Sequence, residues 1–256
     1  MDFSSLHHAG QLFVLPNAWD LGSARALLRA GFPAVGSTSL GVAASHGLLD
    51  AARDIAEKTL ELAQELRGLR CFVSMDIEDG FFDDPADVAA YVRELKVHGI
   101  NLEDSSSGAL VDPELHAAKI SEVKRACPEV FVNARIDTVW LHQDIDVAET
   151  LRRARIYTEA GADGIFVPGA LGTEAISELV RGISLPLNLL PSTDHTAAEL
   201  GALGVRRLST GSLPYRAAMD AAVRAALAVR DSTPLPTATS YQQVMDSMAA
   251  DPGHSG

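Results

Sequence analysis

The sequence alternates short apolar runs with longer amphipathic stretches along nearly its whole length, and this alternation limits the folds open to it. The short runs have the length and composition of buried β-strands. They lie at Leu12–Leu15, Ala34–Gly36, Cys71–Asp76, Ile100–Glu103, Val130–Arg135, Gly164–Val167, Leu187–Leu190 and Val205–Ser209. The stretches with helical spacing lie at Ser23–Ala30, Ala52–Leu66, Pro85–His98, Pro113–Ala126, Asp146–Ala160, Thr173–Gly182, Thr196–Leu203 and Tyr215–Arg230.

Eight strands and eight helices in strict alternation predict a parallel sheet with right-handed crossovers. Eight such units in residues 1–230 match a closed (β/α)8 TIM barrel that forms a single domain. A doubly wound open sheet is the alternative, but no Gly-x-Gly-x-x-Gly follows the first strand. Residues 231–256 are predicted to form an extended C-terminal arm and tail that includes a short segment, Tyr241–Met248.

Glycine stands between a predicted helix and the following strand at Gly31, Gly99, Gly161 and Gly204. Glycine adopts the left-handed conformation that ends many helices without steric cost. We therefore expect each of these glycines to be a helix stop.

The composition excludes several classes of protein. The net charge of −13 argues against nucleic acid and against anionic membrane surfaces, which bind clusters of Lys and Arg. No apolar run reaches the roughly 18 residues that a membrane span requires, and Met1–Ser4 lacks the features of a signal peptide. Cys71 and Cys127 have no metal-ligand spacing. We expect a cytoplasmic protein with two reduced thiols.

Acidic side chains gather where two predicted strands end, in Ser74–Gly80 and in Gly99–Asp104. Active sites of (β/α)8 barrels lie at this end of the strands. Clustered carboxylates repel one another, and a hard divalent cation such as Mg²⁺ would relieve the repulsion. The candidate metal ligands are Asp50, Asp76, Glu78 and Glu103. Mn²⁺ or Ca²⁺ would also suit oxygen ligands, and a pair of solvated acidic turns is the alternative interpretation.

Other polar side chains near these strand ends have different expected roles. Asp79 and Asp104 are offset by one residue, so we expect them to point outward or to cap the next helix. His46 and His195 follow strands and are candidate acid–base groups, with a surface position and a helix-capping position as their respective alternatives.

Arg135 is the one cation well placed at a strand end, on the same face as Asn133 and Asp137. A guanidinium can bind a carboxylate or phosphate through two hydrogen bonds. Charge balance for Glu103 on the neighbouring strand is its alternative role. The turn Gly36–Ser39 offers N–H groups and hydroxyls as a second anion site. Together with a divalent cation, these groups predict a small, multiply anionic substrate such as a 2-oxo acid.

A set of short segments now becomes recognisable. Its members are Pro16–Asp20, Gly22–Ala24, Ser37–Ser39 with Asp50, Asp76–Gly80, Asn101–Asp104, Asn133–Asp137 and Glu159–Asp163. The set resembles the isocitrate lyase/phosphoenolpyruvate mutase superfamily from about residue 5 to about residue 225. The combination is specific, although each segment alone is not.

The resemblance implies a (β/α)8 barrel whose last helix is often exchanged between subunits of a homodimer or homotetramer. It also implies Mg²⁺-dependent making or breaking of C–C or P–C bonds next to a 2-oxo acid. By position, the family's metal carboxylates match Asp50, Asp76, Glu78 and Glu103, its substrate-carboxylate arginine matches Arg135, and its carboxylate-binding backbone matches Ser37 and Thr38.

The chain departs from this family at two places. The family's second metal carboxylate is usually Asp, whereas here it is Glu78, one methylene longer. The family's lyases carry a Lys-Lys-Cys-Gly-His-type loop after the fourth strand and its mutases carry Lys and Asn, whereas Ser105–Leu110 has neither Cys nor Lys. Ser and Gly suit a mobile gating loop. Decarboxylation of a 2-oxo diacid remains feasible because it needs only a proton donor for the enolate.

The leading hypothesis is a Mg²⁺-dependent C–C lyase or decarboxylase that acts on a small 2-oxo or 2-hydroxy di- or tricarboxylate through a metal-stabilised enolate. A P–C bond enzyme acting on phosphonopyruvate or phosphoenolpyruvate is the second candidate. A barrel that binds a 2-oxo acid with weak or no catalysis is the third. The residues expected to act in catalysis are Arg135, Glu103 and Asp50, and those expected to bind substrate are Ser37, Thr38, Arg135 and Asn188.

Overall fold

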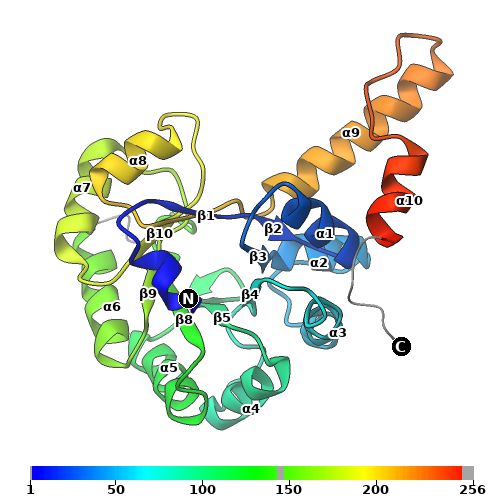
Figure 1. Ribbon diagram of the computed structural model, residues 1–256. Coiled ribbons are helices and arrows are strands. Elements are labelled where there is room, and N and C mark those ends of the chain that lie inside the picture. Colours follow the sequence, from blue (N-terminus) through cyan, green and yellow to red (C-terminus); the bar gives the residue numbers. More distant parts are fainter. Residues whose placement is uncertain (1, 143–146, 250–256) are drawn as a thin grey trace.

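A computed structural model describes residues 2–142 and 147–249, and it confirms the predicted (β/α)8 barrel (Figure 1). One parallel sheet forms the barrel, in the order β1-β11-β10-β9-β8-β5-β4-β3-β2. Its strands are β1 (Phe13–Leu15), β2 (Asn17–Ala18), β3 (Ala34–Ser37), β4 (Phe72–Asp76), β5 (Gly99–Glu103), β8 (Phe131–Arg135), β9 (Gly164–Phe166), β10 (Leu187–Leu189) and β11 (Arg207–Ser209).

The barrel closes through its first strand, which Pro16 divides into β1 and β2. β1 pairs with β11 at one end of the sheet order, and β2 pairs with β3 at the other. Proline has no N–H to donate to a strand ladder, but its carbonyl oxygen still accepts from the Gly36 N–H at 2.8 Å. β1 and β2 therefore count as one barrel strand, which gives the expected eight.

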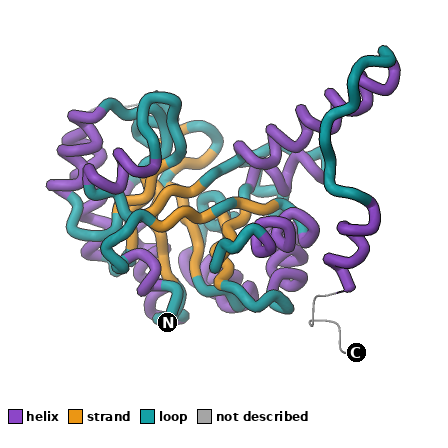
Figure 2. The backbone as a smooth tube through the Cα atoms, turned by 45° about the horizontal axis from the view of Figure 1, so that its top comes forward, coloured by secondary structure: helices purple, strands orange, loops and turns teal. Residues whose placement is uncertain are grey.

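The helices surround the strands, as the layer of purple coils outside the orange strands in Figure 2 shows. They are α1 (Leu21–Arg29), α2 (Ser39–Ser45), α3 (Ala56–Leu66), α4 (Pro85–Leu95), α5 (Pro113–Ala126), α6 (Val147–Glu159), α7 (Thr173–Gly182), α8 (Ala197–Leu203), α9 (Leu213–Arg230) and α10 (Tyr241–Ala249). None of these described helices combines the length and apolar character needed to cross a bilayer.

Two features of the helices differ from the sequence predictions. The helix predicted from Ala52 begins at Ala56, because Ala51 and Arg53 have positive φ angles of 56° and 62°, which a helix does not accommodate. α2 was not predicted, and it begins after Thr38, whose side chain caps it. The predicted start of the fifth helix, Asp146, lies outside the described residues.

Gly31, Gly161 and Gly204 have the positive φ angles expected of helix stops, but the prediction for Gly99 was wrong. α4 ends earlier, with Lys96 in the left-handed conformation, and Gly99 begins β5. A Cβ atom at Gly99 would lie 2.6 Å from the ring of Phe3. This glycine is therefore required by the close approach of the N-terminal segment to the strand.

The apolar core lies between the strands and the helices, because side chains of a strand alternate between its two faces. Val35, Val73, Ile100 and Val132 face the helix layer and are almost fully buried. The positions that alternate with them are largely polar, among them Asn17, Ser74, Asn101, Asn133, Asn188, Arg207 and Ser209, and these are buried as well. The barrel therefore has an apolar outer face, and its interior is polar toward the C-terminal ends of the strands but aromatic at the other end, where Phe13 and Phe131 pack against Phe3.

α9 and α10 extend away from the barrel as an arm (Figures 1 and 2). Large apolar side chains on this arm are exposed, including Met219, Val223 and Leu227 on α9 and Val244 and Met245 on α10. Exchange of the last helix between subunits, the division at residue 230 and the oligomeric state stay predictions.

Candidate active site

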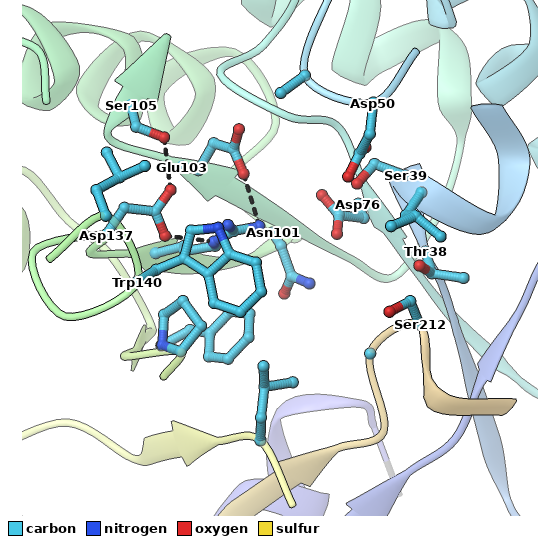
Figure 3. Close-up of a pocket in the computed structure, with 18 of the residues that line it drawn as sticks. Thr38, Ser39, Asp50, Asp76, Asn101, Glu103, Ser105, Asp137, Trp140 and Ser212 are labelled. Atoms are coloured by element: carbon cyan, nitrogen blue, oxygen red, sulfur yellow. Dashed lines mark hydrogen bonds and ion pairs between the residues drawn. The ribbon is translucent and has the colours of Figure 1, made fainter. Parts of the chain in front are cut away.

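A cavity of about 150 Å³ opens at the C-terminal ends of the strands, where the barrel prediction expects an active site. Figure 3 shows that one side carries Asp50, Asp76, Ser39 and Thr38 and the opposite side carries Glu103, Asp137, Ser105 and Trp140. Asn101 lies between the two sides. Of the predicted site residues, the cavity wall contains Thr38, Asp50, Asp76, Glu103 and Arg135.

Asp50 and Asp76 bring two carboxylates next to each other on one side of the cavity (Figure 3). The backbone N–H of Asp76 donates to Ser37 Oγ at 2.7 Å, which fixes the end of β4. Burial raises the pKa of Asp76 to about 6, and the charge of Asp50 adds to the rise while Arg135 opposes it. A pair of carboxylates in this setting gains stability from an added positive charge.

Glu78 does not reach the cavity wall. It follows the end of β4 with a φ angle of 49°, so the two-residue alternation of the strand no longer directs its side chain. The side chain is 2% exposed, and Oε2 accepts a hydrogen bond from the Arg53 N–H at 2.9 Å. Oε1 has no hydrogen-bond partner within residues 2–142 and 147–249. Burial raises the pKa of Glu78 to about 7.

Arg135 lies on the other side of the cavity between two acidic partners. Its Nη1 is 2.6 Å from Glu103 Oε2, and its Nε donates to Asp137 Oδ1 at 2.7 Å. Ser105 Oγ donates to Asp137 Oδ2 at 2.5 Å. The rings of Trp140 and Phe166 flank the guanidinium at 5.9 and 5.8 Å. Arg135 therefore does balance the charge of Glu103, and it also borders the cavity.

Ser37 and Asn188 are buried behind the cavity rather than on its wall. Ser37 holds the backbone of Asp76. Asn188 Nδ2 donates to Ser209 Oγ at 3.1 Å, and Asn188 Oδ1 accepts from the Ser209 N–H at 3.2 Å. The structure therefore places both residues where they support others that face the cavity.

Asp79 and Asp104 point away from the cavity, as expected, but neither caps the following helix, and both are buried. Asp79 pairs with Arg53, and Asp104 Oδ2 accepts from Arg153 at 3.0 Å and from the Tyr157 hydroxyl at 2.7 Å. Capping falls instead to Asp84 for α4 and to Asp112 for α5.

Neither candidate histidine lines the cavity. His46 Nδ1 lies 2.9 Å from the carbonyl oxygen of Val42, and His195 Nε2 lies 2.9 Å from Thr173 Oγ1. His46 thus contacts its own helix, α2, whereas His195 contacts the first residue of α7.

The segment predicted as a gating loop forms a small hairpin, with β6 (Ser105–Ser106) pairing antiparallel to β7 (Ala109–Leu110). Ser107 and Gly108 connect the strands with φ angles of 51° and 78°, as a two-residue type I′ turn requires. Ser105–Gly108 line the cavity. Movement of this hairpin stays a prediction.

Asn101 lies at the centre of the cavity (Figure 3), although no role of its own was predicted for it from the sequence. The signal was available, because Asn101 is two residues before Glu103 on the same strand and therefore on the same face. Asn101 also pairs in register with Asp76 of β4 and with Asn133 of β8.

The carboxylates do not form a ready-made metal cage. Within the described residues, no three His, Cys, Asp or Glu side chains are close enough together to hold a metal ion. Ions that need a full set of protein ligands are therefore poorly matched to this site. An ion that keeps several waters and uses one or two carboxylates is better matched.

Comparison with known proteins identifies the family. The family model for phosphoenolpyruvate phosphomutase matches residues 3–230. An uncharacterized protein of Mycobacterium tuberculosis is 51% identical over 244 residues, which is 95% of each protein. A 2-methylisocitrate lyase of Bacillus subtilis is 28% identical over 197 residues, covering 72% of this chain and 64% of the lyase.

A crystal structure of a Burkholderia cenocepacia J2315 protein assigned as a phosphonomutase superposes with a TM-score of 0.82. The two sequences are 36% identical, and the match covers 87% of this chain and 96% of the other. The family model spans nearly the whole barrel and the cavity residues. The chain is therefore an enzyme of the phosphoenolpyruvate mutase family, within the isocitrate lyase/phosphoenolpyruvate mutase superfamily.

Proposed function

We propose that this protein is a Mg²⁺-dependent enzyme that breaks a C–C bond in a small 2-oxo or 2-hydroxy di- or tricarboxylate, by lysis or decarboxylation. The observation that carries the proposal is the joint exposure of Asp50, Asp76 and Arg135 to one cavity in a chain of this family. A cation held by the first two and a guanidinium on the facing side would bind two oxygens of one substrate.

The residues present fit a magnesium ion. Asp50 and Asp76 supply hard oxygen donors, and the raised pKa of Asp76 reflects buried negative charge that a cation would neutralise. Glu78 has a buried oxygen without a partner in the described part of the chain, which is unfavourable unless a water or an ion satisfies it. We assign Asp50 and Asp76 to the direct shell, and Glu78 and Glu103 to contacts through water. The bound ion would stabilise negative charge on the substrate's C2 oxygen.

Arg135 would orient the substrate carboxylate. Its guanidinium is held on one edge by Glu103 and Asp137, so little side-chain freedom remains to be lost on binding. Thr38 lines the cavity beside Asp76, and Ser37 supports that strand end from behind. Asn188 would act indirectly, through Ser209.

Decarboxylation of a 2-oxo acid releases CO₂ and leaves the electron pair of the broken bond on the carbon next to the 2-oxo group, as an enolate. Lysis of a 2-hydroxy acid instead turns the C2 hydroxyl into a carbonyl, with its proton passing to a base, and leaves the electron pair on the carbon of the departing carboxylate fragment. In both cases a proton must reach the carbon that holds the electron pair. Glu103 borders the cavity as the ion-pair partner of Arg135, and its carboxylate would hold the water that delivers this proton. Ser105, in contact with Asp137, could carry the proton from solvent to the site.

The test is a proton and phosphorus NMR time course near neutral pH with 2-methylisocitrate, isocitrate, oxaloacetate and phosphonopyruvate, with Mg²⁺ and with EDTA. We expect Mg²⁺-dependent loss of one C–C substrate above the no-enzyme rate. Asp50→Asn should abolish that loss while the thermal unfolding midpoint stays near the wild-type value. Arg135→Met should abolish it as well, with a lower midpoint, because the change leaves Glu103 and Asp137 without their buried partner. Arg67→Met, a change at an exposed arginine outside the cavity, is the matched control and should retain activity.

The outcomes separate the candidates. Unchanged turnover in Arg135→Met would refute its assigned role. Persistence of all four compounds at the blank rate would remove both bond-breaking candidates for these substrates and favour a barrel that binds a 2-oxo acid without turnover.

A P–C bond enzyme is the second candidate, favoured by the matching family model and by the phosphonomutase assignment of a 36% identical protein. The absence of Lys and Asn from Ser105–Leu110 counts against it. Loss of the phosphonopyruvate phosphorus signal in the same time course would establish this candidate instead.

A further inference from the structure

Arg207 lies inside the barrel, directly beneath the cavity, and its side chain is 1% exposed. Its Nη2 donates to Asn101 Oδ1 at 3.1 Å, and its Nε donates to Ser209 Oγ at 2.9 Å. Both acceptors line the cavity (Asn101 is labelled in Figure 3), whereas Arg207 itself does not. The guanidinium thus connects two groups on the floor of the cavity, one from β5 and one from β11.

Placing an arginine here is costly for stability. The interior of such barrels is usually filled by branched apolar side chains, and burying an unpaired charge costs several kcal/mol. Arg207 makes no ion pair within the described residues, and its Nη1 has no hydrogen-bond partner there. Burial lowers the pKa of this guanidinium to about 9, and Asp76 only partly opposes the effect. A residue with this cost calls for a functional explanation.

Arg207 fixes which end of the Asn101 amide faces the cavity. A guanidinium has five donors and no acceptor, so the atom of Asn101 that it contacts must be the carbonyl oxygen. Asn133 Nδ2 donates to the same oxygen at 2.9 Å. Both lone pairs of Oδ1 are therefore used, and the Nδ2 group of Asn101 remains to donate to a ligand.

Arg207 also determines which hydrogen bond the hydroxyl of Ser209 can offer to the cavity. Its Oγ accepts from Arg207 Nε at 2.9 Å and from Asn188 Nδ2 at 3.1 Å. A hydroxyl oxygen has two lone pairs and one proton, so two incoming donors leave only the proton to offer. Asn101 and Ser209 therefore both present donors from the cavity floor.

We propose that Asn101 Nδ2 and Ser209 Oγ form a binding subsite for an anionic oxygen of a small carboxylate, and that Arg207 is the positioning residue that makes both of them donors. The inference rests on the proposed function, because it concerns the same cavity. Asp50 and Asp76 on the cavity side accept and suit a cation, whereas the floor donates and suits an oxyanion. The side of the cavity would therefore bind the metal ion, and the floor would bind a negatively charged oxygen of the substrate.

Oxalate is a suitable probe because it is a small dianion that fits the cavity. It has as many non-hydrogen atoms as benzene, and benzene binds in a protein cavity of about 150 Å³, the volume of the cavity described above. The experiment is isothermal titration calorimetry of oxalate into the protein with saturating Mg²⁺, together with thermal unfolding of each variant. Wild type should bind. Failure of wild type to bind would refute the proposed function and, with it, this subsite.

Asn101→Asp is the decisive variant. The carboxylate is nearly isosteric and accepts the hydrogen bonds from Arg207 and Asn133, so the unfolding midpoint should not fall. It replaces the donor of the subsite with a negatively charged acceptor. Oxalate affinity should fall about 10- to 100-fold or more, the loss that follows from removing a hydrogen bond to a charged group. Wild-type affinity in this variant would overturn the inference and leave the proposed function standing.

Arg207→Lys tests the positioning role. A lysine keeps the charge but lacks the fork that reaches both acceptors, so affinity should fall in this variant. In an Asn101→Asp background the same change should have a smaller effect, because only the orientation of Ser209 then still depends on Arg207. Equal losses in the two backgrounds would show a general structural effect and would refute the positioning role. Arg67→Lys, on the outer helix layer, is the control for the exchange itself and should bind as wild type does.

Discussion

Asp104 offers a sharp test of how the active-site end of the barrel is held. Its side chain is fully buried, and three donors converge on it. Asp104 Oδ1 accepts from the Asp137 N–H at 2.8 Å, and Oδ2 accepts from Tyr157 at 2.7 Å and from Arg153 at 3.0 Å. The change Asp104→Asn keeps the shape of the side chain but removes its charge. It also turns an NH₂ group toward at least one of these donors.

The expected loss of stability follows from these contacts. Removing one partner of a buried ion pair costs about 3–5 kcal/mol. Arg153 keeps two other acceptors, Glu149 Oε1 at 2.8 Å and the carbonyl oxygen of Val111 at 3.0 Å. We therefore expect the lower end of the range, about 3 kcal/mol. For a protein of this size that corresponds to a fall in unfolding midpoint of roughly 6–12 °C.

The assay is thermal unfolding followed by far-UV circular dichroism, with Glu149→Gln as the control. Glu149 holds the same arginine but is 21% exposed, so its loss should cost less than about 1 kcal/mol. The double variant Asp104→Asn/Arg153→Met removes the charge that the single variant leaves unpaired, so it should regain much of the lost stability. A single-variant midpoint within about 2 °C of wild type, or a double variant less stable than Asp104→Asn, would refute the reasoning.

Two further predictions concern the metal and the lower end of the barrel. Mg²⁺ at 100 times its dissociation constant should stabilise the wild-type fold by about 2.7 kcal/mol. Asp76→Asn should reduce this stabilisation strongly. Equal stabilisation of the two proteins in a thermal shift assay would contradict the metal assignment. His7 is stacked on Phe131 at 4.0 Å, and burial lowers its pKa from 6.5 to about 3. Because the folded pKa is depressed, the unfolded chain takes up a proton first as pH falls below about 6.5, and stability is lost from there down to about 3. Between pH 7 and pH 5, wild type should lose about 2 kcal/mol more than His7→Phe in urea unfolding, and parallel pH profiles would rule this out.

The order of the elements could be predicted because each depends on local pattern. The chain contains apolar runs that are too short for helices, with amphipathic stretches between them. This pattern predicts eight βα units without any knowledge of the tertiary contacts. The unpredicted features arise where the backbone leaves regular geometry. Arg53 takes a positive φ angle, which shortens α3, and Pro16 divides the first strand in two.

Within the site, too, predictions from the sequence failed where the backbone leaves regular strand geometry. Arg135 and Asp137 were predicted to share a face with Asn133, and the structure brings Arg135 and Asp137 into contact at 2.7 Å beside the cavity. Asp76 and Glu78 were expected to share a face by the same rule. β4 ends at Asp76, however, and the left-handed backbone at Glu78 turns its side chain to Arg53. Asp137 also lies two residues beyond the end of its strand, but its φ angle is not positive, so alternation beyond a strand end fails where the backbone turns left-handed.

The sequence by itself therefore determined the barrel, the end of it that carries the chemistry, and the acidic and cationic groups available there. The tertiary structure alone decided which of those groups face one another. Arg207 and Asn101 are 106 residues apart, and no local pattern relates them. They meet because β5 and β11 both contribute side chains to the same barrel interior, and contacts across a closed sheet depend on its closure and register.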